Sequence, residues 1–101
     1  MAHMRPLVAL INGNVRAGGG KYDEALAAFD LAVELAQPMS FLPTIWRAHD
    51  GAARVHAAMG NEVEAKSRRD SAIMVINEIS SMFENKELRE HFLAKSLAKL
   101  G

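Results

Sequence analysis

The chain has 101 residues, enough for one domain with a modest core. Twelve lysines and arginines balance twelve aspartates and glutamates, so no net charge favours binding to nucleic acid or to an anionic membrane surface. The sequence has no cysteine, which excludes disulfides, thiolate catalysis and cysteine-ligated zinc and is in keeping with a cytoplasmic protein. No apolar run approaches the roughly 20 residues of a membrane span, so we expect no membrane as a partner. Because the charge is balanced, we expect no nucleic acid as a partner either.

Glycines and prolines divide the chain into five segments, each with helical periodicity. The opening letters MAHM look like a cloning remnant, and we take residues 5–101 as a single domain. We predict an all-α fold with a first helical hairpin at about residues 6–37, a second at about 42–83 and a final helix at about 86–100.

In the first hairpin, Leu7, Ile11 and Val15 recur at a spacing of four residues, which predicts an amphipathic helix from Pro6 to Ala17. The next helix has a broader apolar stripe, so we expect it to pack on more than one side. The stripe contains Tyr22, Ala25, Leu26, Phe29, Ala32, Val33 and Ala36, widened by Leu31 and Leu35.

The second hairpin joins two further amphipathic helices at Gly60, where Asn61 and Glu64 have the spacing of a capping box. The stripe of its first helix contains Ile45, His49, Ala52, His56 and Met59, and the seam of its second contains Ala65, Ala72, Ile76, Ile79 and Phe83. The final helix follows Asn85 and is expected to bury Leu88, Phe92, Leu93, Leu97 and Leu100.

The segment GGGK at residues 18–21 raises one alternative, the phosphate loop of a nucleotide-binding enzyme. Such a loop needs a glycine five residues before its Gly-Lys pair and a hydroxyl residue after it, whereas this chain has Val15 and Tyr22 there. No segment after residue 20 has the pattern of a further strand. We therefore expect a turn between two helices, with at least one glycine at positive φ, and no cofactor. The enzyme stays a remote alternative.

The chain contains an internal repeat with a period of 40 residues. Its first copy has Gly20, Glu24, Ala25 and Ala32, which recur as Gly60, Glu64, Ala65 and Ala72. The two alanines of each copy lie seven residues apart, on one face of the second helix of their hairpin. Small residues at this position allow the paired helices to approach closely.

These residues make the chain similar to the tetratricopeptide repeat (TPR) family. The segment GKYDEALAAF followed by alanine, with Gly20, Tyr22, Glu24, Ala25, Phe29 and Ala32, matches the turn and second helix of that repeat. Gly13 and Asn14 match a glycine-asparagine pair of its first helix, whereas Arg69 replaces the usual aromatic residue of the second copy. The spacing exceeds the usual value of about 34 and resembles the longer repeats of bacterial signalling ATPases and transcription regulators.

The resemblance, which covers about residues 7–83, implies hairpins stacked in a right-handed superhelix with the last helix as a cap. It also implies a non-catalytic module that binds a peptide or protein segment in a concave groove. The groove positions implied in this chain that carry polar side chains are Asn14, Arg47, Asp50 and Arg54. The three on the second hairpin also form a polar stripe on the face opposite His49 and His56. Because two hairpins and a cap are few for a stable array, a homodimer acting as a structural domain of a larger regulatory protein is the alternative function.

Two other groups of residues are interpreted as structural. His49 and His56 are seven residues apart, about 10 Å along a helix, and no acidic residue shares their stripe, so we do not assign them to a metal site. The basic segment at residues 66–69 has acidic neighbours and is interpreted as a solvated face.

Overall fold

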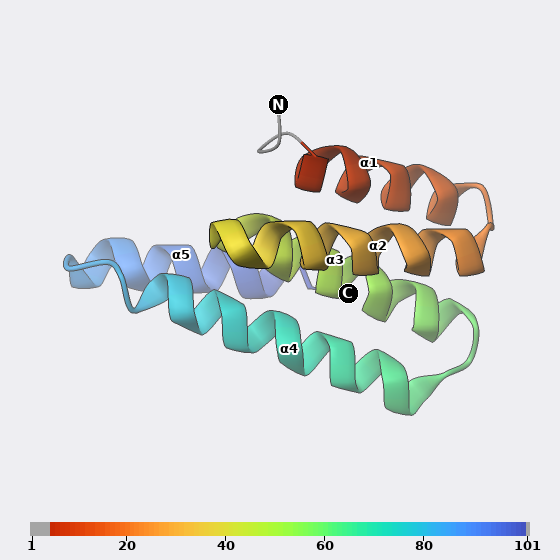
Figure 1. Ribbon diagram of the computed structural model, residues 1–101. Helices are drawn as coiled ribbons and strands as arrows, with labels where there is room; N and C mark the ends of the chain where they lie inside the picture. The colour runs from red at the N-terminus through yellow and green to blue at the C-terminus, as the bar shows by residue number, and fades with distance from the viewer. Residues whose placement is uncertain (1–4, 101) are drawn as a thin grey trace.

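The computed structural model describes residues 5–100; the four opening residues that resemble a cloning remnant lie outside them. The described chain forms five α-helices: α1 (Arg5–Gly18), α2 (Tyr22–Ala36), α3 (Leu42–Ala58), α4 (Glu62–Ser80) and α5 (Lys86–Ala98). A short 3-10 helix, η2 (Gln37–Met39), follows α2 directly, where the sequence suggested only a break. No strand occurs within residues 5–100, so the all-α prediction is confirmed and residues 7–11 are helical (Figure 1).

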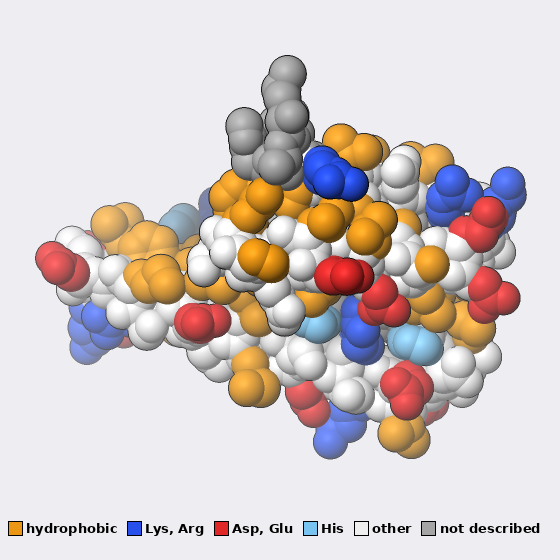
Figure 2. Space-filling model, in the orientation of Figure 1, with side chains coloured by type: hydrophobic (Ala, Val, Ile, Leu, Met, Phe, Trp, Pro, Cys, Tyr) orange, Lys and Arg blue, Asp and Glu red, His pale blue; other side chains and the backbone are white. Residues whose placement is uncertain are grey.

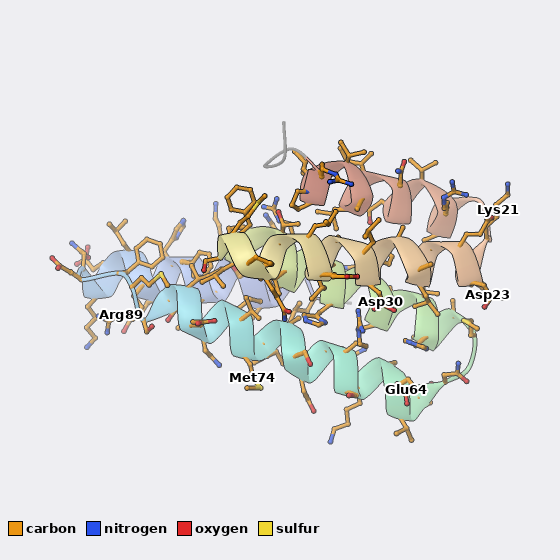
Figure 3. The ribbon with its side chains drawn as sticks, viewed as in Figure 1. Lys21, Asp23, Asp30, Glu64, Met74 and Arg89 are labelled. Carbon is orange, nitrogen blue, oxygen red and sulfur yellow. The ribbon has the colours of Figure 1, made fainter. Side chains whose placement is uncertain are left out.

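The two hairpin turns are built alike. In the first, Gly20 has φ 77°, its N–H bonds to the Ala17 carbonyl, and the Lys21 N–H bonds to the Arg16 carbonyl. In the second, Gly60 has φ 82°, and the same two hydrogen bonds recur 40 residues later. This pattern is a Schellman motif, whose left-handed residue is nearly always glycine. The predicted helix–turn–helix connection at GGGK is thus confirmed, and both turns lie at one end of the molecule (Figures 1 and 3).

The helices are stacked in chain order (Figure 1). α2 packs against both α1 and α3, α4 packs against α3, and α5 returns along α4. The alanines of the repeat lie where the helices meet: Ala25, Ala32, Ala65 and Ala72 are all buried. The predicted alanine seam is therefore the packing surface of both hairpins.

The first core cluster has Phe29 at its centre, with no exposed surface. Its ring lies between α1 and α3 at positions where each helix carries a glycine. A Cβ atom on Gly13 would lie 2.6 Å from the ring, and one on Gly51 would lie 2.4 Å from it. Because both distances are shorter than contacts between carbon atoms allow, only glycine permits this approach. Phe29 thus fixes how the second hairpin sits on the first.

The second core cluster lies at the other end of α3 and is built around Trp46, Ala72 and Ile76. The side chains that pack against it from α4, α5 and the residues after α5 are Val75, Ile79, Phe92, Leu93 and Leu100. α3 belongs to both clusters, so it is the central element of the fold.

The structure differs from the sequence pattern both in burial and in capping. Leu31 and Met59, which were expected on apolar stripes, are exposed. The bulky stripe of α1 is exposed, because Pro6, Ala9, Leu10 and Gly13 form its buried face instead. In α5, Leu88 and Leu97 are exposed, which corrects the expectation that all five of its apolar residues are buried. The side chain of Asn61 makes no capping hydrogen bond at the start of α4, whereas Asn85 Oδ1 accepts a bond from the Leu88 N–H at the start of α5.

Candidate functional site

The four residues predicted from the resemblance lie together. Asn14 on α1 and Arg47, Asp50 and Arg54 on α3 line one hollow of about 440 Å³. Its other lining residues are Leu10, Trp46, Gly51 and Lys99. Gly13 and Gly51 hold α1 and α3 close through Phe29, so the packing of the core places this polar stripe beside α1.

An ion pair fixes the centre of this hollow. Arg54 Nε donates to Asp50 Oδ2 at 3.1 Å, across one turn of α3. The Asp50 side chain is only 12% exposed, whereas that of Arg54 is 57% exposed. Arg54 Nη2 also donates to the backbone carbonyl of Lys99, which ties the end of α5 to α3. Asp50 therefore serves to hold a guanidinium whose outer surface stays open to a ligand.

A second hollow of about 410 Å³ adjoins the first and shares Trp46, Arg47 and Lys99 with it. It lies between α3 and α5, and its further lining residues are Pro43, Phe83, Leu88, His91, Phe92, Lys95 and Ser96. The Arg47 guanidinium lies over the Trp46 ring at 5.6 Å, a cation–π contact that holds the arginine at the boundary. The two hollows together are called the α3 groove below.

The charge of the α3 groove differs from that of the whole chain. Its lining contains Arg47, Arg54, Lys95 and Lys99, against the single carboxylate of Asp50. The neutral total therefore conceals a local excess of positive charge, placed next to the exposed side chain of Leu88 and the partly buried ring of Phe92. Such a surface attracts a negatively charged ligand that also carries an apolar group.

His49 and His56 lie on another side of α3, next to α4. Burial lowers the pKa of His49 from its ordinary value of 6.5 to about 4; the Arg68 charge adds to the effect and the Asp30 charge opposes it. Arg68 Nη1 pairs with Asp30 Oδ1 at 2.9 Å, so it joins α4 to α2 (Figure 3 marks Asp30). The Nδ1 atoms of His49 and His56 are buried and have no hydrogen-bond partner.

A third hollow, of about 600 Å³, also lies on this side. His49 and Glu78 are the titratable groups of its lining, which has no lysine or arginine; the other lining residues are Gln37, Ser40, Leu42, Ile45, Ser71, Met74 and Val75. It therefore offers less charge for recognition than the α3 groove.

Lys99 and Lys95 could not be assigned to the groove from the sequence. Their position depends on α5 turning back along α4 until its end reaches α3, and nothing in the local pattern of residues 86–100 encodes that path. Trp46 carried a partial signal, because it lies one residue beyond the main stripe of its helix and so at the edge of the buried face.

Residues 5–100 lack two features that would indicate other functions. No cluster of three histidine, aspartate or glutamate side chains in this part of the chain is placed to hold a metal ion. No helix there combines the length and the apolar character needed to cross a bilayer.

The comparisons with known proteins give no relative. No family, no curated protein and no solved structure matches this chain.

Proposed function

We propose that this chain is a TPR-type interaction module that binds an acidic segment of another protein in the α3 groove, without catalysis. The ligand carries an apolar side chain that packs beside Leu88 and Phe92, and its carboxylates pair with the basic side chains that line the groove. The proposal rests on one observation: the four residues that the resemblance implied line a hollow whose charge and apolar surface suit such a segment.

The repeat architecture supports this function in physical terms. The two similar glycine turns and the alanine seams produce stacked hairpins, which present the face of α3 next to that of α1. Neighbouring helices of this kind form extended surfaces that fit a peptide along several residues. The larger hollow beside His49 lacks basic groups and is the weaker candidate.

A titration with fluorescent peptides tests the proposal. The probes are peptides rich in Asp and Glu with one Phe or Leu, and matched peptides in which Lys replaces each acidic residue. Trp46 is the only tryptophan of the chain and lines the groove, so its fluorescence reports binding independently. We expect only the acidic peptides to bind. They should bind more weakly at high salt, because mobile ions screen the charges of the basic side chains that line the α3 groove.

Arg47→Glu should lower the affinity for the acidic peptides about tenfold or more, since it replaces a positive charge of the α3 groove with a negative one that repels them. Lys66→Glu is the matched control: it makes the same charge change at an exposed position of α4 outside the groove lining. Equal losses in the two variants would mean that only the overall charge matters. Equal binding of acidic and basic peptides would contradict the proposed ligand class.

A further inference from the structure

The outer face of α1 is apolar and exposed. We use this name for Leu7, Val8, Ile11 and Val15, whose exposed fractions range from 41% to 68%. No charged residue occurs from residue 6 to residue 15, so nothing polar interrupts the face except asparagine at its edges. Figure 2 shows hydrophobic side chains along α1 at the upper edge of the molecule. A continuous apolar surface of this kind marks an interaction site.

The internal repeat shows what kind of surface this is. Forty residues after Val8, Ile11 and Val15 come Ala48, Gly51 and Val55, and these three are buried where α3 stacks against the first hairpin. Leu7 is the exception, because its equivalent is Arg47, which is exposed in the α3 groove. Three of the four residues of the outer face of α1 are thus equivalent to a stacking surface that the chain covers at α3 and leaves open at α1.

A second copy cannot cover α1 in the way that α2 covers α3, because its α2 is already covered by its own α3. The helix that a head-to-tail neighbour would offer instead is α4, the equivalent of α2. It carries Arg69 at the position equivalent to Phe29, and it also packs against α5. Head-to-tail stacking of identical copies therefore does not repeat the packing at α3, and a different geometry has to bury the face.

The spacing of the face provides that geometry. Leu7, Ile11 and Val15 lie four residues apart, so Ile11 is the midpoint of a symmetrical stripe. When two such helices pack antiparallel, Ile11 meets its own copy and each Leu7 meets a Val15 of the partner. We propose that two copies of this chain associate through the outer face of α1, antiparallel about a two-fold axis at Ile11. This interface goes beyond ligand binding in the α3 groove.

The charges at the two ends of α1 complement each other in this arrangement. Arg16 Nη1 pairs with Glu24 Oε1 at 3.1 Å, so Glu24 lies beside the end of α1. Arg5 lies at the start of α1, close to the same edge of the helix as Arg16 by helical spacing. An antiparallel partner brings Arg5 of one copy next to Glu24 of the other, so the carboxylate lies between two guanidinium groups.

Leu31 of α2 extends the apolar surface. It is 46% exposed and lies seven residues after Glu24, hence on the side of α2 that faces the edge of α1. One helix face with this extension is small for an interface, so we expect a dissociation constant on the order of micromolar.

Cysteine cross-linking tests the geometry directly, because the chain has no cysteine of its own. Under mild oxidation, Ile11→Cys should form a disulfide-linked dimer, since the two-fold axis brings this position against itself. Leu7→Cys and Val15→Cys should cross-link with each other when mixed, and little with themselves. Val63→Cys is the matched control, a cysteine at an exposed valine on α4. If Leu7→Cys and Val15→Cys each link mainly to themselves, the helices are parallel and the proposal is wrong.

Sedimentation velocity on the unmodified chain tests the association itself, from nanomolar to millimolar concentration. The weight-average mass should rise from monomer to dimer. Ile11→Asp should weaken the dimer at least about tenfold, while circular dichroism shows an intact fold. Arg5→Glu should weaken it about two- to fivefold, and adding Glu24→Lys should restore part of that loss. A monomer at every concentration, with Ile11→Cys linking no more than Val63→Cys, overturns the proposal and leaves the face to a different protein.

Discussion

Phe29 can lie at the junction of three helices only because two of them carry glycine where its ring passes. A glycine within a helix normally costs about 1 kcal/mol relative to alanine, so Gly51 is an unfavourable choice for α3 alone. The complete burial of the Phe29 ring offsets this cost. The helical stripe of α2 predicted that Phe29 is buried. The partner of its ring on α3 could not be predicted, because that pairing depends on how the second hairpin stacks.

Gly51→Ala should therefore destabilise the protein, although the same change in an ordinary helix stabilises it. The added methyl would lie 2.4 Å from the Phe29 ring, which has to shift within a packed core. We expect the free energy of unfolding to fall by about 1 to 3 kcal/mol, measured by urea denaturation followed by circular dichroism.

Gly18→Ala is the matched control for that experiment. Gly18 is the last residue of α1 and has no atom within 4 Å of the added Cβ position, so its substitution should raise stability by about 0.4 to 1 kcal/mol. Combining Gly51→Ala with Phe29→Leu should cost less than the sum of the two single changes. Strict additivity would mean that the ring and the glycine do not restrict each other.

At the scale of the helices, periodicity identified all five α-helices but did not show which face of each helix is covered. In α1 the bulky stripe of Leu7, Ile11 and Val15 stays outside, because the smaller face with Gly13 allows the closer approach to Phe29. In α5 the spacing of leucines predicted the helix but not the exposure of Leu97. The spacing of apolar residues shows that a helix forms. Which of its faces is buried depends on the helices that pack against it.

His49, which lies on α3 next to α4, should make the free energy of unfolding depend on pH. Because burial lowers its pKa to about 4, the unfolded chain takes up a proton near pH 6.5 while the folded chain does not. The contribution of neutral His49 to stability is therefore complete above pH 6.5 and is lost as the pH falls toward 4. Since the side chain is only half-buried and solvent screens its charge, we expect a loss of about 1 to 2 kcal/mol.

Urea denaturation at a series of pH values measures this effect. In His49→Gln the decline between pH 6.5 and 4 should become shallower, because no titrating group remains at that position. His91→Gln, at an exposed histidine of α5, is the comparison variant for the loss of a histidine elsewhere in the chain. If the two variants behave alike, the pH dependence has another origin.

For the whole molecule, the stacking in chain order makes stability a sum of contacts between neighbours. α3 takes part in both core clusters, whereas α1 contributes to only one and the side chains of α5 only partly cover the other. The sequence predicted the number of helices and their pairing into hairpins. It could not predict the charge of the α3 groove, because Lys95 and Lys99 reach the groove only through the path of the whole chain.

This arrangement predicts a gradient of amide hydrogen exchange. The amides of α3 should exchange most slowly, by unfolding of the whole domain, and those of α1 and α5 faster, by local opening at the two ends of the stack. The rate of exchange in α1 should also depend on the protein concentration. If copies associate through the outer face of α1, raising the concentration slows exchange in α1 but not in α5, because only α1 loses its freedom to open. Mass spectrometry of peptic fragments separates the two ends. Uniform exchange in all five helices would show that the domain unfolds as one unit, and it would contradict the picture of a stack whose ends open independently.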